Sequence, residues 1–437
     1  MGNSRYNFDT IKVNGGYNPA EHNYSVQVPI YQTASYETGG PERLDDLRCH
    51  KEVGFLYSRM SNPTAAVLEK RIAQLHGAVG AIATSSGAAA ISYALLAIAE
   101  GGGRIITTNQ LYGGTLGTLI YLFSKFGIEV DVVPIDANID DYAKVIKEDT
   151  KAIFVESISN PTAIPVDIEE LSKLAHDNNI PLVVDNTIAT PYLLNPFEFG
   201  ADIVVYSATK GISGHGNAIG GLIVQGEDIK WTENKKFNQF HEKRFALRDD
   251  KGDIRNFLET FPQIPYLAKI NTDYAVHLGS SLSAFDAYLI LIGLETISER
   301  LNKTIASTIE ILKYLEKNEN VEWVSYPTLE SSPYKELSKK YFPKGAGGVF
   351  SFGIKGGKEE IYKFLNSLNV FSYQINIGDS RSLVTNPPKS THFGLTEEEL
   401  INAKIPLNTI RISIGLEDSD DLINDLNQAF QITFSAN

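Results

Sequence analysis

The sequence has a single cysteine, no long hydrophobic run and no excess of positive charge. Cys49 alone cannot form an intramolecular disulfide, and one thiol among few histidines is not expected to build a thiolate metal site. No apolar run reaches the ~18 residues that a membrane helix needs, and the N-terminal stretch M-G-N-S-R-Y-N-F-D-T contains no apolar signal core. A net charge of −14 argues against nucleic acid or anionic membrane as a partner. These absences predict a cytoplasmic protein.

What is present is a globular composition, with 43% hydrophobic and 21% charged residues in 437. At roughly 150 residues per domain, this length predicts two or three domains. From about Thr64 to Val224, helical patterns alternate with short apolar strands, which is typical of a large, doubly wound, mostly parallel sheet covered by helices. The predicted strands are Gly80–Thr84, Arg104–Thr107, Val130–Pro134, Ala152–Glu156, Leu182–Asp185, Ile203–Tyr206 and Gly221–Val224.

The segments outside this alternation set the predicted domain boundaries. Residues 1–62 lack a clear period and are predicted to form an arm that contacts a neighbouring subunit. Residues 63–290 are predicted to form the large domain, with a polar and charged insertion at about 226–279 that contains some helix. Residues 291–437 are predicted to form a small α+β domain.

One helix start is well marked, because Ser61-Asn62-Pro63-Thr64 offers a polar cap followed by proline in the first turn, and Gly77 closes the pattern. A long helical stretch from about Ala284 through Leu315 is expected to lead into the C-terminal domain. The further elements predicted in that domain are strands within 347–354 and 409–416 and helices around 361–368 and 421–430.

Polar side chains stand where several predicted strands end. In open α/β sheets, ligands bind beyond the carboxyl ends of the strands. The polar residues at these ends are Glu156, Asp185, the run Ser85-Ser86-Gly87, Ser207, Thr209 and Lys210.

The run T-S-S-G-A-A-A-I suits the binding of a phosphate by backbone N–H groups at a helix start, although Ser-Ser-Gly also makes an ordinary helix cap. Ser207 and Thr209 are hydroxyl donors available to the same anion. An amine at the mouth of the sheet, Lys210, beside a phosphate cradle suggests a Schiff base with a carbonyl cofactor, pyridoxal phosphate (PLP).

PLP requires a carboxylate that faces its pyridine nitrogen. Asp185 precedes Lys210 by 210 − 185 = 25 residues, about one strand–helix–strand step, so both are expected on neighbouring strand ends. A carboxylate about 4 Å from a cation contributes roughly 4 kcal/mol at an effective dielectric near 20. The alternative for Asp185 is a helix cap at a strand end.

Seven longer motifs occur in order along the chain: Y-S-R-M-S-N-P-T (57–64), L-Y-G-G-T (111–115), E-S-I-S-N-P-T (156–162), D-N-T-I-A-T-P (185–191), S-A-T-K-G-I-S-G-H-G (207–216), G-D-S-R-S-L-V (378–384) and R-I-S-I-G-L-E-D (411–418). Together they resemble those of the Cys/Met-metabolism PLP enzymes, a family that includes cystathionine γ-synthase, methionine γ-lyase and O-acetylhomoserine sulfhydrylase. The resemblance implies an aspartate-aminotransferase-like (fold type I) α/β fold.

The resemblance also implies roles for single residues. Lys210 is implied to be the catalytic Schiff-base lysine, and Asp185 the partner of the pyridinium nitrogen. Tyr112 is implied to stack on the cofactor ring and to assist proton transfer, and Asn160 to bond the phenolic oxygen. The implied phosphate ligands are Ser207, Thr209 and the N–H groups of Gly87 and Ala88.

Two further sets of residues complete the implied site. Tyr57 and Arg59 are implied to reach the phosphate site of a neighbouring subunit, in a homotetramer built from dimers with shared sites. Arg411 resembles the clamp for the substrate carboxylate, for which a planar bidentate donor is suited, with Ser382 beside it. No metal site is predicted.

Within the family, the chain is most similar to the homoserine-ester sulfhydrylase branch (aminocarboxypropyltransferases). The insertion after the lysine strand and the segments 277–296 and 330–353 carry this similarity. The implied reaction is the γ-replacement of O-acetyl-L-homoserine by sulfide, giving L-homocysteine and acetate in methionine biosynthesis. The alternatives are methionine γ-lyase or cystathionine γ-synthase type activity, although methionine γ-lyases usually carry cysteine where this chain has Gly114.

Two places depart from the family pattern. Relatives typically read His-Pro-Ala-Ser before Thr-His, whereas residues 386–395 read N-P-P-K-S-T-H-F-G-L. Gly211 stands where sulfhydrylases often have an aromatic residue. These departures concern the substrate side of the site, and the acyl group that leaves and the thiol that attacks stay open.

Overall fold

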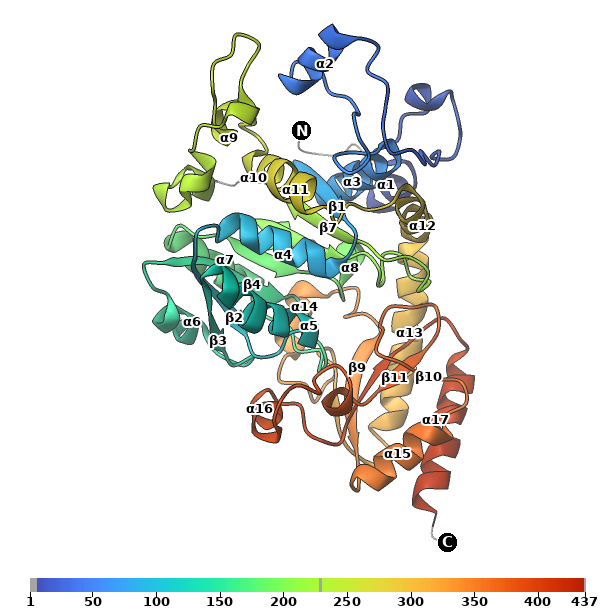
Figure 1. Cartoon of the computed structure of the whole chain (residues 1–437). Helices are drawn as coiled ribbons and strands as arrows, with labels where there is room; N and C mark the ends of the chain where they lie inside the picture. Colours follow the sequence, from blue (N-terminus) through green and yellow to red (C-terminus); the bar gives the residue numbers. More distant parts are fainter. Residues whose placement is uncertain (1–5, 228–229, 436–437) are drawn as a thin grey trace.

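The computed structural model describes residues 6–227 and 230–435 (Figure 1). The ends of the predicted arm and of the C-terminal domain, residues 1–5 and 436–437, and residues 228–229 of the predicted insertion lie outside the described residues. Two sheets organise the described chain, one of seven strands and one of five.

The larger sheet has the strand order β1-β7-β6-β5-β4-β2-β3. Neighbours pair in parallel from β6 through β3, and only β7 runs antiparallel to the strands on its two sides. The mostly parallel, doubly wound sheet is therefore confirmed. Its strands are β1 Gly80–Thr84, β2 Gly103–Thr108, β3 Ile128–Val133, β4 Thr150–Glu156, β5 Leu182–Asp185, β6 Ile203–Ser207 and β7 Gly221–Gln225.

The central strands read as continuous apolar runs because helices cover both faces of a parallel sheet. Each residue of β5 and β7 is buried. α4 crosses the sheet and packs on β6 and β7 (Figure 1). The helices of this part of the chain are α3 Pro63–His76, α4 Gly87–Ile98, α5 Gly113–Gly117, α6 Ile139–Val145, α7 Ile168–Asp177 and α8 Thr190–Leu193.

The marked helix start is confirmed in α3. The side chain of Asn62 accepts the N–H of Thr64 at 2.9 Å, and Pro63 occupies the first turn. Gly77 ends the helix at φ +64°, a conformation that favours glycine.

The smaller sheet lies at the other end of the molecule (Figure 1) and has the order β10-β11-β12-β9-β8. The predicted strands β9 and β12 are present, and the sequence pattern did not predict the other three. Helices α15 and α17 pack against each other beside this sheet. The elements are β8 Val321–Ser325, α14 Lys335–Tyr341, β9 Val349–Ile354, α15 Lys358–Ser367, β10 Ser372–Tyr373, β11 Leu383–Thr385, α16 Glu397–Asn402, β12 Thr409–Ser413 and α17 Ser419–Phe434.

The connection between the two sheets is the predicted long helical stretch, which is interrupted at one residue. α12 spans Ala284–Glu295 and α13 spans Ile297–Leu315, and Thr296 between them leaves the helical conformation with φ −116° and ψ 19°. Gly293 lies so close to Ser213 that an added Cβ would stand 2.0 Å from the Ser213 carbonyl oxygen. The domain boundary near residue 290 stays a prediction.

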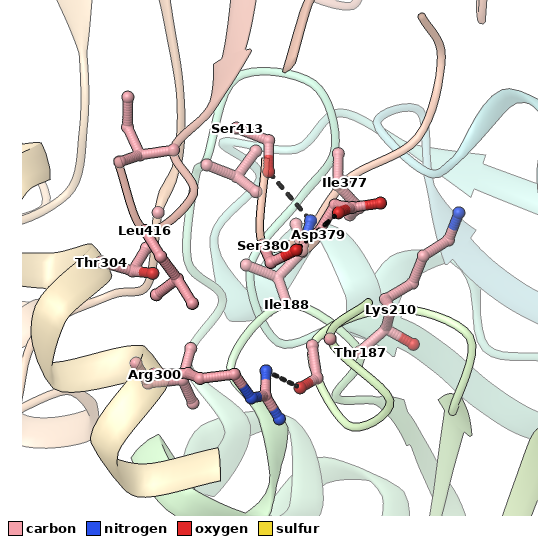
Figure 2. Close-up of a pocket in the computed structure, with 17 residues that line it drawn as sticks. Thr187, Ile188, Lys210, Arg300, Thr304, Ile377, Asp379, Ser380, Ser413 and Leu416 are labelled. Atoms are coloured by element: carbon pink, nitrogen blue, oxygen red, sulfur yellow. Dashed lines mark hydrogen bonds between the residues drawn. The ribbon is translucent and has the colours of Figure 1, made fainter. Parts of the chain in front are cut away.

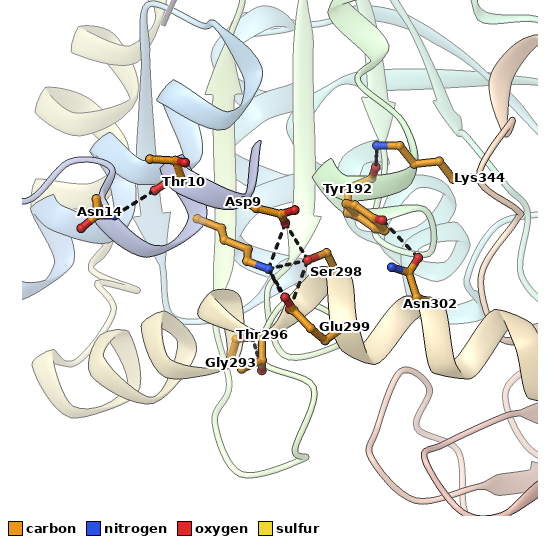
Figure 3. A network of polar contacts seen from close by, with 11 residues as sticks. Asp9, Thr10, Asn14, Tyr192, Gly293, Thr296, Ser298, Glu299, Asn302 and Lys344 are labelled. Carbon is orange, nitrogen blue, oxygen red and sulfur yellow. Dashed lines mark hydrogen bonds and ion pairs between the residues drawn. The ribbon is translucent and has the colours of Figure 1, made fainter. Parts of the chain in front are cut away.

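The N-terminal segment contains helices that the sequence did not reveal, α1 Phe8–Asn14 and α2 Pro41–Arg48. α1 packs on α3 and α12 of its own chain. Lys12, which is buried, is held there by Asp9 at 2.9 Å and by Glu299 at 2.7 Å, with Ser298 as a third partner. Figure 3 shows Asp9, Ser298 and Glu299 side by side. The first part of the predicted arm is therefore fastened to its own subunit, whereas α2 projects from the body in Figure 1.

The predicted insertion consists of short helices that pack near β1. The insertion elements are η5 Lys230–Glu233, η6 Lys235–Phe240, η7 Phe245–Leu247, α9 Phe257–Thr260, α10 Pro265–Lys269, η8 Ile270–Ala275 and α11 Val276–Leu278.

None of the helices in the described part of the chain is both long and apolar enough to cross a membrane.

Candidate active site

A cavity of about 350 Å³ lies at the carboxyl ends of β4, β5 and β6, beside the start of α4. This is where open α/β sheets bind ligands. Eight of the twelve predicted site residues line it: Gly87, Ala88, Tyr112, Asn160, Asp185, Ser207, Thr209 and Lys210.

One end of the cavity is suited to an anion. Ser86 caps α4 by accepting the N–H of Ala89 at 3.1 Å, so the helix-cap reading of this run is correct. Gly87 and Ala88 occupy the first turn, where backbone N–H groups have no acceptor within the helix. Gly87 packs so tightly on Ser207 that an added Cβ would lie 2.6 Å from its Cβ. The cap leaves other N–H groups of the same helix start available to an anion, so the predicted phosphate cradle is compatible with it.

Lys210 lies in the turn that follows β6, and its half-buried side chain lines the cavity. Its Nζ donates to Oδ1 of Asn376. Burial, with a smaller effect of the Arg411 charge, lowers the pKa of Lys210 from 10.5 to about 8. A substantial fraction of this amine is therefore neutral near physiological pH, which a nucleophile or a general base requires.

The backbone after Lys210 is fixed by Arg300 of α13. Its guanidinium donates to the carbonyl of Gly211 at 3.0 Å and to that of Ile212 at 3.2 Å. Figure 2 shows Arg300 directed toward this turn, while the amine of Lys210 points away from it. α13 therefore holds the lysine turn from outside the cavity.

Two buried carboxyl groups stand side by side at the ends of β4 and β5, because Glu156 and Asp185 are partners in the strand register. Burial raises the pKa of Asp185 to about 6, while the N–H of Thr187 bonds its Oδ1 at 3.0 Å. Burial and the neighbouring Asp185 raise the pKa of Glu156 to about 8. Two neighbouring carboxyl groups do not both ionise readily, and Asp185 lines the cavity, where its carboxylate is available to a cation.

Arg411 comes from β12 of the smaller sheet and is only 2% exposed. It donates from Nη1 to Oδ1 of Asn160 at 2.9 Å, and from Nη2 to the carbonyls of Ile375 and Asn376 at 3.0 and 3.2 Å. Because a guanidinium only donates, the amide oxygen of Asn160 must face it. The NH₂ group of Asn160 therefore remains as a donor on the cavity side.

Tyr112 stands at the start of α5 with its ring over Gly114. An added Cβ at Gly114 would lie 2.6 Å from Cε1 of the tyrosine. A cysteine at this position, which methionine γ-lyases usually carry, would therefore displace the ring from its present place.

Three predicted site residues are not brought to this cavity. Tyr57 is 43% exposed, and Arg59 donates to the Val276 carbonyl on the outer surface. Ser382 is fully buried and donates to Glu417 at 2.8 Å. The roles of all three stay predictions.

With this geometry in view, the chain can be compared with known proteins. The family model described as Cys/Met metabolism PLP-dependent enzyme matches residues 9–431. The chain belongs to this family. It is 41% identical to a homocysteine synthase of Schizosaccharomyces pombe over 97% of this chain and 98% of that one. It is 39% identical to an O-acetyl-L-homoserine sulfhydrylase of Leptospira meyeri, over 97% and 96% of the two chains.

A solved structure gives the same picture. A Campylobacter jejuni protein assigned as O-acetylhomoserine (thiol)-lyase, which carries a pyridoxyl-lysine phosphate, superposes with a TM-score of 0.92 at 38% identity. The superposition covers 98% of this chain and all of that one. The fold type I architecture and the PLP cofactor of this Cys/Met-metabolism enzyme are thereby confirmed.

The donor set of the cavity fits PLP. A phosphate needs the N–H groups and hydroxyls at the α4 end, a pyridinium needs Asp185, and an aldehyde needs the amine of Lys210 with its lowered pKa. Glu156 was predicted at a strand end but without a role, and Asn376 was not predicted at all. Asn376 stands in an irregular segment, without a strand or a helix start to indicate it.

Proposed function

We propose that this enzyme catalyses the γ-replacement of O-acetyl-L-homoserine by sulfide, which gives L-homocysteine and acetate. The observation that carries the proposal is one cavity lined by Lys210, Asp185 and Asn160, with Arg411 bonded to Asn160, in a chain similar over nearly its whole length to a homocysteine synthase and an O-acetyl-L-homoserine sulfhydrylase. This reaction belongs to methionine biosynthesis, since homocysteine is the thiol that methionine synthesis methylates.

Arg411 is suited to bind the substrate carboxylate. Three of the five N–H donors of a guanidinium bond Asn160, Ile375 and Asn376, which leaves 5 − 3 = 2 donors for a carboxylate. A buried, charge-assisted contact orients the substrate as well as binding it. The three bonds to the protein fix the orientation of the guanidinium before the substrate binds.

PLP, when bound, supplies a ring that withdraws electrons from the carbon beside the substrate amino group. Asp185 holds the negative charge that favours a protonated ring nitrogen. Lys210, once the substrate amine has taken its place, moves protons at Cα and Cβ as general base and acid, a role worth typically 10²–10⁴-fold. At Cγ the bond to the acetyl oxygen breaks, acetate leaves with the electron pair, and sulfide forms the new C–S bond.

The same proposal includes a cytoplasmic homotetramer built from dimers that share active sites. Tyr57 and Arg59 support it, because they lie on the outer surface rather than in the cavity of their own chain. Light scattering on the purified enzyme tests the assembly. Adding Arg59→Ala protein to an excess of inactive Lys210→Ala protein tests the sharing, since mixed dimers would regain one intact site.

Purified enzyme with PLP and O-acetylhomoserine, with and without sulfide, tests the reaction. Sulfide-dependent homocysteine with little 2-oxobutyrate is the expected result, and Lys210→Ala is expected to lose it. Release of 2-oxobutyrate regardless of sulfide would instead show a γ-lyase. Cystathionine formed on adding cysteine in place of sulfide would show cystathionine γ-synthase activity.

A further inference from the structure

The carboxyl group of Glu156 accepts hydrogen bonds from two segments that border the cavity. Glu156 ends β4 and is 6% exposed. One of its oxygens accepts the N–H of Tyr112 at 2.7 Å, and the other accepts the N–H of Asn160 at 2.9 Å. Because each oxygen bonds a different segment, this single side chain bridges the start of α5 and the turn after β4.

The two residues bonded in this way, Tyr112 and Asn160, carry side chains whose positions in the cavity are closely constrained. The ring of Tyr112 lies over Gly114, where there is no room for a Cβ. The side chain of Asn160 accepts from Arg411 at 2.9 Å. A shift of the Glu156 carboxyl group would therefore be passed to the aromatic wall of the cavity and, through Asn160, to the guanidinium of Arg411.

Few side chains could replace this bridge. Both oxygens of a carboxyl group accept hydrogen bonds, whereas glutamine offers one oxygen and presents an NH₂ group to the second N–H. Aspartate keeps the carboxyl group but is one methylene shorter, so it cannot reach both segments from the same strand position. A buried carboxyl group beside Asp185 is also a costly choice for a contact that serves packing alone.

We propose that Glu156 is a positioning residue, which holds the Tyr112 and Asn160 segments in register so that the PLP cavity and the Arg411 clamp are formed together. The part of this inference that concerns Arg411 and substrate rests on the proposed function. The part that concerns PLP rests on the geometry of the cavity.

The test compares Glu156→Gln and Glu156→Asp with wild-type enzyme and with Glu69→Gln. Glu69 is the matched control, because it also accepts a backbone N–H, that of Ala83 at 2.8 Å, and its pKa is raised to about 7 by burial, yet it does not line the cavity. Three quantities are measured: the dissociation constant of PLP from the apoprotein by absorbance titration, KM and kcat, and the melting temperature.

Loss of one bond of the bridge is expected to raise the PLP dissociation constant about tenfold, and KM for O-acetylhomoserine about tenfold, in both Glu156 variants. KM for sulfide is expected to stay unchanged, and Glu69→Gln is expected to lower only the melting temperature. A Glu156→Gln enzyme that melts earlier but keeps wild-type PLP affinity and KM would overturn the proposal, as would full function of Glu156→Asp. The aspartate variant carries the test if the glutamine variant does not fold.

The PLP titration needs no substrate, so it separates the two proposals. If the wild-type enzyme made no homocysteine, the proposed reaction would fail while the titration still decided the role of Glu156. If homocysteine formed and the titration showed no change, only the positioning role would fail.

Discussion

Replacement of Arg411 by lysine is the perturbation whose outcome follows most directly from the geometry. An ammonium group is a compact charge and cannot reproduce the planar fork that bonds Asn160, Ile375 and Asn376 while presenting two further donors. A hydrogen bond to a charged group contributes about 1.5–3 kcal/mol. Since 1.4 kcal/mol is about one decade, KM for O-acetylhomoserine is expected to rise about 10- to 100-fold.

The pattern of kinetic constants distinguishes this cause from general damage. The carboxylate contact exists in the bound substrate and in the transition state alike, so kcat is expected to change much less than KM. Initial rates of homocysteine formation, with each substrate varied in turn, measure both constants. Sulfide has no carboxylate, so its KM is expected to stay as in the wild type, and Arg381→Lys, at a side chain 71% exposed, is the matched control. An unchanged KM for O-acetylhomoserine would refute the role of Arg411.

Three further predictions concern the amine, the carboxylate and the loop beside the site. The rate at which the apoprotein binds PLP covalently, followed by stopped-flow absorbance, is expected to rise with pH and to level off above a midpoint near 8. Only the neutral Lys210 amine attacks, and its pKa is lowered to about 8. A midpoint above 10 would contradict this. Asp185→Asn is expected to weaken PLP binding in an equilibrium titration by up to about three decades. The reason is the loss of roughly 4 kcal/mol from a carboxylate–cation pair at an effective dielectric near 20. Unaltered affinity would exclude the pairing of Asp185 with the ring nitrogen. Gly113→Ala would place a Cβ 1.9 Å from the Thr391 carbonyl oxygen, so denaturant unfolding is expected to show a free energy of unfolding lower by about 1–3 kcal/mol. In the control Gly117→Ala, the Cβ meets open space in the same helix, and the free energy of unfolding is expected to stay unchanged.

The larger sheet was predictable because each of its strands is a short apolar run between polar turns. All seven predicted strands overlap the observed ones, with ends that differ by two residues or fewer. The smaller sheet was predicted less completely because two of its strands are very short. β10 has only two residues, both exposed, and β11 has only three. β12, the strand that carries Arg411, lies between β11 and β9, and its buried arginine is bonded by partners from outside the strand.

The site was predictable to the extent that its residues follow strands. Asp185, Ser207, Thr209 and Lys210 meet because parallel strands end at one edge of a sheet. Residues that arrive from loops, such as Asn376, carry no periodic signal. The bridging role of Glu156 was also hidden, because its partners are backbone N–H groups, and any residue except proline supplies one.

The unusual 386–395 segment is bonded to the backbone beside Tyr112 through His392. Burial lowers the pKa of His392 to about 4, so its ring is neutral. The Leu111 carbonyl, 3.1 Å away, can only accept, so Nε2 must carry the proton and Nδ1 must accept the hydroxyl of Thr391 at 2.9 Å. The segment that departs from the family pattern is thus bonded to the residue just before Tyr112. Because Glu156 bonds the N–H of the next residue, Tyr112, changes in the segment are expected to act on the cavity through this stretch of backbone.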